Sequence, residues 1–232
     1  NFRLAKKDLL VVFLLSLLRA TTSFSLLIAY QNIAVASTIH FMYPLAVALA
    51  MMFFFREKKS LLVILAVLMS LLGAALLSLG ELEAKSGNTM VGLVAACVSV
   101  FSYAGYIVGV RTTRAVQINS TALTCYVMGL GTIFYLIGAY CTSGLQLVSD
   151  GYTWLIILGL ALPATAISNI TLVQAIKYAG PTLTSILGAM EPLTAVVIGV
   201  FVFKELFTVN SAVGIILILL AVSIVVFRRQ KS

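Results

Sequence analysis

The stretch from Ile39 to Ser60 reads IHFMYPLAVALAMMFFFREKKS, and the stretch from Leu187 to Thr208 reads LGAMEPLTAVVIGVFVFKELFT. The two align without a gap at a constant separation of 148 residues, which is the distance from Pro44 to Pro192. In each copy a basic residue and an acid follow the apolar run, and a further apolar run comes next. The chain therefore contains an internal repeat, which is a common building principle of transporters.

The repeat lies in a chain whose composition suits a membrane. Of its 232 residues, 62% are hydrophobic and 9% are charged, whereas an ordinary globular domain has about 25% charged residues. A spanning helix needs about 20 mostly apolar residues. Eight such runs occur, at 9 to 30, 33 to 55, 61 to 79, 90 to 110, 121 to 142, 153 to 177, 181 to 203 and 209 to 227. We predict an all-α membrane protein with eight transmembrane helices. Two of them, 61 to 79 and 209 to 227, carry small residues such as Gly73 and Gly214, and we expect these helices to serve as packing elements.

The basic residues outside the apolar runs favour one side of the membrane. Twelve of them share the side of the N-terminus: Arg3, Lys6, Lys7, Arg56, Lys58, Lys59, Arg111, Arg114, Lys177, Arg228, Arg229 and Lys231. Only Lys85 and Lys204 fall on the other side. Because cytoplasmic loops are enriched in Lys and Arg, we expect both ends of the chain to be cytoplasmic, in the plasma or inner membrane. The net charge of +8 is explained by these loops, and we expect a lipid bilayer rather than nucleic acid as the partner.

The loop charges give the two copies of the repeat opposite directions. The copy with Pro44 and Glu57 runs from outside to inside, and the copy with Pro192 and Glu205 runs from inside to outside. Inverted repeats are typical of carriers whose halves are related by a pseudo-two-fold axis in the membrane plane, with the solute site near the midplane.

The two copies have different numbers of helices around them. The first is the last but one of three helices in residues 1–80, and the second is the last but one of five in residues 90–229. Two further helices ahead of residue 1 would complete the first half. We therefore expect a ten-helix, five-plus-five inverted-repeat fold, of which this chain holds eight helices.

These motifs make the sequence resemble the EamA-type carriers of the drug/metabolite transporter superfamily, over the third to tenth helices of that fold and without its first two. The resemblance rests on YQNIAVASTIHFMYPLAVALAMMFFFREKKS, on VQAIKYAGPTLTSILGAMEPLTAVVIGVFVFKELFT and on the Gly-containing helix after each. It implies a transporter with a central cavity, often exporting amino acids, metabolites or drugs. We expect neither a cofactor nor a metal, and the sequence leaves a homodimer open.

Two charged residues lie at membrane depth. The helical rise of about 1.5 Å per residue puts Arg19 about 16 Å and Glu191 about 15 Å from their cytoplasmic ends, near the midplane. We hypothesise that both line the cavity and pair across it, with Arg19 binding an anionic group of the solute and Glu191 carrying a coupling proton. The structural alternatives are an ion pair for Arg19, and for Glu191 a hydrogen-bonding role beside Pro192, which lacks an N–H.

Other polar and aromatic residues at helical spacing complete the candidate substrate-binding set: Ser23, His40, Tyr103, Tyr106, Asn169 and Gln174. His40 is interpreted either as a cavity-wall residue or as a satisfied polar residue of the interior. The two tyrosines form either an aromatic wall or ordinary core packing. Asn169 and Gln174 follow Pro163, where a kinked helix would leave a carbonyl available to a ligand or to a neighbouring helix.

The leading functional hypothesis is a secondary transporter that moves a small metabolite by alternating access, in the direction of export. An amino acid-like, drug-like or other small polar or amphipathic solute suits walls with few charges. The Gly-Lys-Ser/Thr phosphate-binding motif does not occur, so an ion gradient or exchange would supply the energy. The alternatives are an intramembrane enzyme acting on a lipid-linked substrate, which would need clustered catalytic groups, and a membrane subunit without transport activity. We expect the chain not to be an enzyme.

Overall fold

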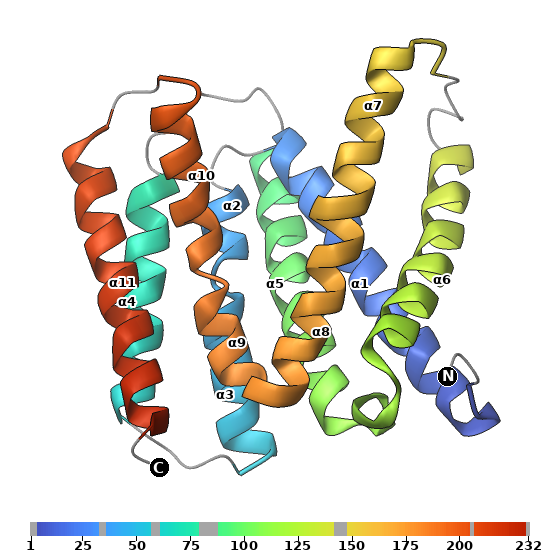
Figure 1. Cartoon of the computed structure of the whole chain (residues 1–232), viewed down its shortest axis with the longest axis horizontal. Helices are drawn as coiled ribbons and strands as arrows, with labels where there is room; N and C mark the ends of the chain where they lie inside the picture. The colour runs from blue at the N-terminus through green and yellow to red at the C-terminus, as the bar shows by residue number, and fades with distance from the viewer. Residues whose placement is uncertain are drawn as a thin grey trace. The chain divides into compact units, whose positions relative to one another are not determined.

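The computed structural model of the chain describes residues 4–32, 36–56, 61–78, 88–141, 148–204 and 207–230. Every regular element within these ranges is a helix (Figure 1). The elements are α1 (Lys6–Asn32), α2 (Ala36–His40), α3 (Tyr43–Phe54), α4 (Leu61–Ser78), α5 (Thr89–Thr112), η2 (Arg114–Gln117), α6 (Ser120–Cys141), α7 (Gly151–Gly159), η3 (Leu160–Ile167), α8 (Ser168–Ala179), α9 (Pro181–Leu187), α10 (Met190–Phe201) and α11 (Val209–Gln230). The element η2 is a 3-10 helix, and η3 is a π-helix.

The described helices include six stretches that are long and apolar enough to cross a membrane. They are Lys6–Asn32, Ala36–Phe54, Thr89–Thr112, Ser120–Tyr140, Gly151–Ala179 and Pro181–Phe201. The apolar parts of α4 and α11, Leu61–Leu77 and Val209–Ile224, are shorter. The predicted all-helical membrane fold is confirmed at this level, and the count of eight spans stays a prediction.

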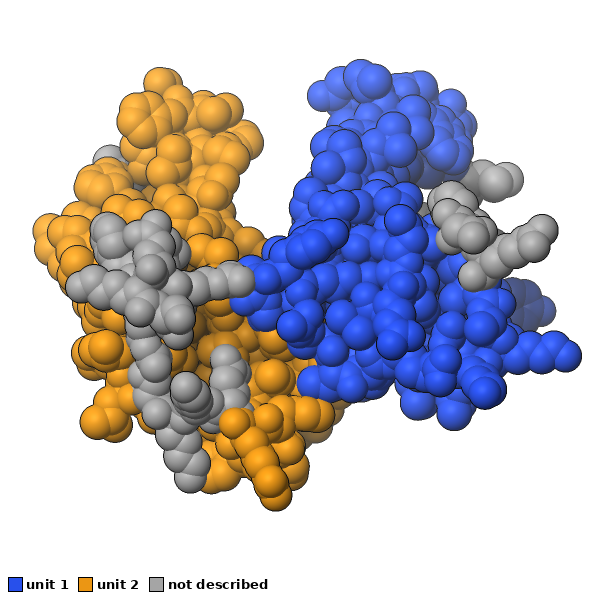
Figure 2. All heavy atoms as spheres, turned by 60° about the horizontal axis from the view of Figure 1, so that its bottom comes forward, with its two compact units in different colours: residues 1–20, 109–180 blue, residues 21–108, 181–232 orange. Residues whose placement is uncertain are grey.

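The chain forms two compact units, each made of two segments (Figure 2). Unit 1 comprises Asn1–Ala20 and Gly109–Gly180, and unit 2 comprises Thr21–Val108 and Pro181–Ser232. Both α1 and α5 contribute residues to each unit. The predicted repeat halves, residues 1–80 and 90–229, are defined by sequence repetition and not by contacts. They are a different division from the two compact units, and they stay a prediction.

In unit 1, α1 packs against α6 through one polar and one aromatic contact. The Ser16 hydroxyl donates to the Val127 carbonyl at 2.9 Å, and the Ser16 side chain is fully buried. The rings of Phe13 and Phe134 meet edge to face with centroids 5.8 Å apart. Such a buried hydrogen bond to a helix carbonyl is a common way to join helices inside a bundle.

Charged side chains tie together the ends of α5 and α8 in the same unit. Arg111 Nη1 donates to the Lys177 carbonyl at 2.6 Å, and Lys177 Nζ donates to the Ile118 carbonyl. Arg114 Nε pairs with Asp8 Oδ1 at 2.9 Å. The donors of Arg111 and Lys177 satisfy carbonyls near helix ends, where intrahelical partners are missing.

In unit 2, α4 and α11 lie side by side and touch backbone to backbone (Figure 1). A Cβ built on Gly73 would lie 2.7 Å from the Gly214 carbonyl oxygen, and one built on Gly214 would lie 2.8 Å from the Gly73 carbonyl oxygen. Small residues allow such an approach, which increases the van der Waals contact that joins helices in lipid.

This contact predicts opposite effects for the same substitution at two glycines. Gly73→Ala is expected to lower the free energy of unfolding by about 1–3 kcal/mol, because the added methyl would meet a backbone carbonyl that cannot rotate away. A methyl added at Gly129 on α6 would meet nothing within 4 Å. Gly129→Ala is therefore expected to raise the free energy of unfolding by about 0.5–1 kcal/mol, because alanine favours the helix. Unfolding in detergent followed by circular dichroism measures both. Changes of the same sign would contradict the close contact.

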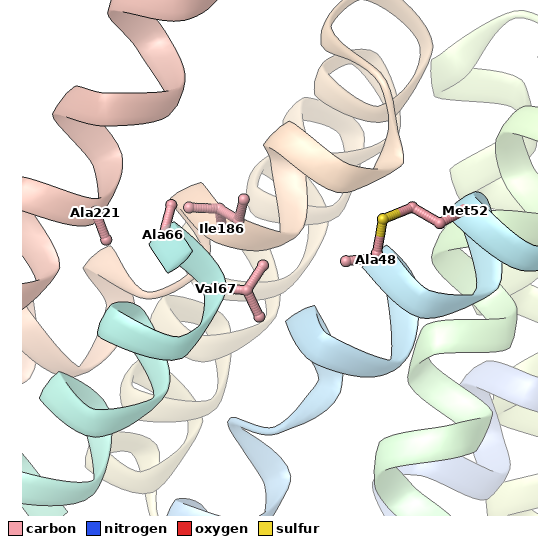
Figure 3. Close-up of a cluster of buried hydrophobic side chains, with 6 residues drawn as sticks. All are labelled: Ala48, Met52, Ala66, Val67, Ile186 and Ala221. Carbon is pink, nitrogen blue, oxygen red and sulfur yellow. The ribbon is translucent and has the colours of Figure 1, made fainter. Parts of the chain in front are cut away.

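The apolar core of unit 2 lies where α3, α4, α9 and α11 meet (Figure 3). Its buried members are Ala48, Met52, Ala66, Val67, Ile186 and Ala221. Four of the six are alanine or valine, so the helices approach closely at this point. Through this core, α9 packs against α3. The helix α9 is the first part of the predicted span 181–203, and α3 is the second part of the predicted span 33–55.

Two of the predicted spans are interrupted by a turn in this unit. The span at 33–55 consists of α2 and α3 with a turn at residues 41–42, and the span at 181–203 consists of α9 and α10 with a turn at residues 188–189.

Proline explains both interruptions. Pro44 and Pro192 each lie in the first turn of the second helix. A proline has no N–H to donate to the carbonyl four residues earlier, and its ring crowds that carbonyl. The helix therefore opens just before each proline and begins again at the proline's own turn.

The two copies of the repeat also match in backbone conformation. Arg56 and Lys204, which are 148 residues apart, both have positive φ angles, of 55° and 60°. Such angles are uncommon outside glycine, and both residues stand just after the ends of α3 and α10. In Figure 1, α2–α3 runs downward and α9–α10 runs upward. The repeat residues Glu57 and Glu205 lie outside the described residues.

Candidate functional site

The predicted site residues divide between the two units. Unit 1 holds Arg19, Asn169 and Gln174, and unit 2 holds Ser23, His40, Tyr103, Tyr106 and Glu191. Because Arg19 and Glu191 belong to different units, their hypothesised pairing stays a prediction.

In unit 1 the structure brings Arg19 of α1 to Asn169 of α8. Arg19 Nε donates to Asn169 Oδ1 at 3.4 Å. Asn169 is 4% exposed, its Nδ2 donates to the Thr165 carbonyl at 2.7 Å, and its own carbonyl accepts from Thr124 Oγ1 at 3.5 Å. The amide is thus held by contacts at both its ends. Arg19 is partly exposed, and a guanidinium has five N–H donors, of which this contact uses one.

The π-helix η3 precedes this contact and contains Pro163. Thr165 Oγ1 donates to the Leu160 carbonyl at 2.8 Å, five residues back. The predicted proline kink is therefore a stretch of wider helix, and π-helical turns are frequent at functional sites. Asn169 lies in the turn that follows. Gln174 is exposed on α8, about 140° around the helix from Asn169, so the structure does not group the two amides.

In unit 2, His40 at the end of α2 contacts Ser99 of α5. His40 Nδ1 and Ser99 Oγ are 3.0 Å apart, and Ser99 Oγ also donates to the Ala96 carbonyl at 2.6 Å. A serine hydroxyl has one proton, so Ser99 donates to only one of these two partners at a time. His40 has the hydrogen-bond partner expected of a satisfied polar residue.

An aromatic cluster surrounds this histidine. The ring of His40 lies 5.6 Å from that of Tyr43 and 5.4 Å from that of Tyr103. Tyr43 meets Tyr103 edge to face at 4.7 Å, and Tyr103 stacks on Tyr106 at 6.4 Å. Tyr103 is 8% exposed and Tyr106 is fully buried. The rings of this cluster are therefore packed against one another inside unit 2.

The functional candidate that sequence reasoning missed is Tyr43. It is 2% exposed, and its hydroxyl occupies the place that a Cβ would take on Gly188. Glu191 is exposed at the start of α10, and its N–H donates to the Gly188 carbonyl at 3.0 Å. The repeat alignment could have indicated Tyr43, because Tyr43 and Glu191 are 148 residues apart and so are equivalent positions in the two copies.

Ser23 lies next to the polar contact between α1 and α5 in unit 2. It is partly exposed, while the neighbouring Thr22 is buried and its hydroxyl lies 3.0 Å from that of Ser102. In the parts of the chain that the structure describes, no three His, Cys, Asp or Glu side chains gather as a metal site would require.

Comparison with known proteins gives a family. No protein in the curated comparison matches the chain. A solved structure described only as the crystal structure of a protein superposes with a TM-score of 0.82, over 100% of this chain and 80% of its own, at 18% identity. That likeness shows a shared fold. Residues 90–227 match the EamA-like transporter family. Since this match covers more than half of the chain, the chain belongs to the EamA-like transporter family.

Proposed function

We propose that the chain is a secondary carrier that exports a small zwitterionic or amphipathic metabolite by alternating access. The observation that carries this proposal is the matched pair of interrupted helices, α2–α3 and α9–α10, which run in opposite directions in unit 2 (Figure 1). Inverted repeats with broken helices are typical of secondary carriers, and the interruptions lie where the solute binds.

The matched interruptions support the five-plus-five inverted repeat. The prolines that open the helices and the positive φ angles after α3 and α10 recur at one separation of 148 residues. Such agreement at both ends of a segment is what two copies of one structural unit would have. From the asymmetry of Lys and Arg between the loops, we also propose that both ends of the chain lie on the cytoplasmic side of the plasma or inner membrane.

Within unit 1, Arg19 is the proposed binding residue. Arg19, which contacts Asn169, supplies a cation for the carboxylate of the solute, because guanidinium and carboxylate match in charge and geometry. Glu191, exposed beside the second interruption, takes up and releases the proton that couples transport to a pH gradient.

Counterflow in vesicles tests this function. The purified chain is reconstituted in vesicles loaded with unlabelled leucine, threonine and phenylalanine, and uptake of each labelled amino acid is measured against protein-free vesicles. We expect uptake severalfold above the protein-free level, with no uptake of labelled glucose 6-phosphate into vesicles loaded with that ester. Uptake at the protein-free level for all three amino acids would contradict the proposal.

A further inference from the structure

Four apolar helical stretches have an end on the same side of unit 1 (Figure 1). Two begin there and two end there: Lys6–Asn32, Ser120–Tyr140, Thr89–Thr112 and Gly151–Ala179. Side-chain contacts join these ends, from α1 to η2 and from α5 to α8. The ends of helices that cross a bilayer lie near the level of the lipid headgroups. This side of unit 1 therefore borders the phosphates of one leaflet.

The charges on this side, which we call the basic end, are almost all positive. Among the described residues, five basic side chains and one acid lie there: Lys6, Lys7, Arg111, Arg114, Lys177 and Asp8. The first four of these are exposed. The Asp8 carboxylate is already paired with Arg114 Nε at 2.9 Å. The described part of the basic end therefore has no second carboxylate for the remaining cations.

The link between α5 and α6 is ordered without help from its two arginines. Thr113 Oγ1 donates to the Gly109 carbonyl at 2.7 Å and accepts from the Ala115 N–H at 3.3 Å. Ala115 is fully buried. Asn119 Oδ1 accepts from the Thr121 N–H at 3.0 Å at the start of α6. Because the link satisfies these backbone groups itself, the two guanidinium groups are presented on a fixed turn.

Each of these arginines has hydrogen-bond donors to spare. Arg111 Nη1 donates to the Lys177 carbonyl at 2.6 Å, and Arg114 contacts Asp8 through Nε. A guanidinium has five N–H donors in a planar fork. A phosphate group accepts two parallel hydrogen bonds from such a fork. The basic end can therefore bind a phosphate without giving up the contacts that join its helices.

An exposed apolar stripe begins beside these charges on α1. Lys7, Leu10, Leu14 and Leu17 are spaced by three or four residues, so they share a helix face. All four are exposed, and the three leucines are 66%, 48% and 41% exposed. The contact of Asp8 with Arg114 places the start of this stripe next to η2. A phosphate with an apolar chain attached fits this arrangement better than a free phosphate does.

We propose that the basic end of unit 1 binds an anionic phospholipid. The lipid phosphodiester lies between the lysines that begin α1 and the arginines of the link between α5 and α6, and an acyl chain follows the leucine stripe. Basic groups between transmembrane helices bind anionic headgroups, with each Lys or Arg strengthening binding about fivefold. The proposal goes beyond the carrier function and does not depend on it.

Native mass spectrometry of the purified chain in neutral detergent measures lipid binding without any transport. The chain is titrated with phosphatidylglycerol, phosphatidylcholine or the water-soluble glycerol 1-phosphate. We expect phosphatidylglycerol to bind at least about tenfold more tightly than phosphatidylcholine, because only the former is anionic. Equal affinity for the two lipids would overturn the proposal. Binding of glycerol 1-phosphate as tight as that of phosphatidylglycerol would show a free-phosphate site and would overturn it as well.

Removing two cations of the basic end tests where the lipid binds. Lys6→Gln combined with Lys7→Gln is expected to weaken phosphatidylglycerol binding about 25-fold, at about fivefold for each charge. The matched control combines Arg56→Gln with Lys204→Gln, which removes two exposed cations from unit 2, and is expected to change the affinity less than twofold. Equal weakening in both double variants would show an effect of net charge alone and would contradict the site.

Removing the acid of the basic end is expected to have the opposite effect. Asp8→Asn should tighten phosphatidylglycerol binding about fivefold, because it removes a negative charge and releases Arg114 Nε for the phosphate. Asp150→Asn removes an acid at the start of α7, the opposite end of that apolar stretch, and is expected to leave the affinity unchanged. Weaker binding in Asp8→Asn, or equal tightening in both variants, would contradict the proposal.

Thermal unfolding in detergent gives a second measure of binding in solution. A ligand that binds only the folded state raises the unfolding temperature. Phosphatidylglycerol is therefore expected to raise this temperature in the parent chain and in the unit 2 control, and to raise it less in the variant without Lys6 and Lys7. An equal increase in all three proteins would overturn the proposed site.

Discussion

Arg19→Gln is expected to slow counterflow of labelled leucine about a hundredfold, the largest loss among single substitutions in unit 1. Removing one partner of a desolvated charge pair costs about 2–5 kcal/mol, and about 2.7 kcal/mol corresponds to a factor of one hundred. In the proposed carrier the group left without its partner is the carboxylate of leucine. Initial rates over a range of leucine concentrations measure the effect.

Two further variants decide whether Arg19 binds solute or only joins helices. Arg19→Lys keeps the charge but loses the planar donor geometry, and it is expected to retain part of the rate with a raised KM. Arg114→Gln removes a cation whose side chain is 54% exposed in its contact with Asp8, and it is expected to change the rate less than twofold, because exposed ion pairs contribute little. Equal loss in Arg19→Gln and Asn169→Leu, with KM unchanged in Arg19→Lys, would favour a structural role.

The helices themselves could be predicted from the sequence because burial in lipid requires long apolar runs. All eight apolar runs contain helix in the structure, and α4 and α11 pack through the small residues that the sequence singled out. The contact of Gly73 with Gly214 could not be predicted, since an apolar run does not say which helix lies beside it.

The interruptions show where apolar periodicity is insufficient. Hydropathy is continuous across residues 41–42 and 188–189, so each run predicted one helix. The prolines at 44 and 192 were the available signal, since the carbonyl four residues before a proline loses its donor. At Pro163 the sequence predicted a kink, and the structure has a π-helix. Which of the two forms depends on local hydrogen bonds, and these cannot be read from the sequence alone.

Polarity marks Arg19 and Asn169 as candidates in the sequence, whereas nothing in the sequence of its own helix marks Tyr43. Arg19 and Asn169, both polar at membrane depth, meet in the structure. Tyr43 has no such mark, because a buried tyrosine beside other rings is ordinary packing. Tyr43 becomes a candidate through two observations. It is equivalent to Glu191 in the repeat, and its hydroxyl occupies the space where Gly188 has no side chain.

Glu191→Gln is expected to abolish accumulation of leucine driven by a pH gradient while leaving counterflow within about threefold of the parent chain. Glutamine keeps the size and hydrogen-bonding capacity of the side chain but cannot carry a proton at neutral pH. If Glu191 serves only to bond helices beside Pro192, the glutamine variant would accumulate leucine as the parent does. Uptake with and without an imposed pH gradient separates the two roles.

Asp150→Asn is the matched control for removing an acid. Asp150 caps α7, where it accepts hydrogen bonds from the backbone N–H and the hydroxyl of Thr153, each at 2.8 Å. The backbone hydrogen bond from Thr153, above all, lowers the pKa of Asp150 below its ordinary value of 3.8. A lowered pKa means that the cap contributes stability above that value and loses it only as the pH falls through the lowered pKa. Asp150 therefore stays ionised throughout the neutral range, and its replacement is expected to leave gradient-driven accumulation unchanged. Equal loss of accumulation in Asp150→Asn and Glu191→Gln would show a general effect of removing negative charge, and the proton role of Glu191 would fail.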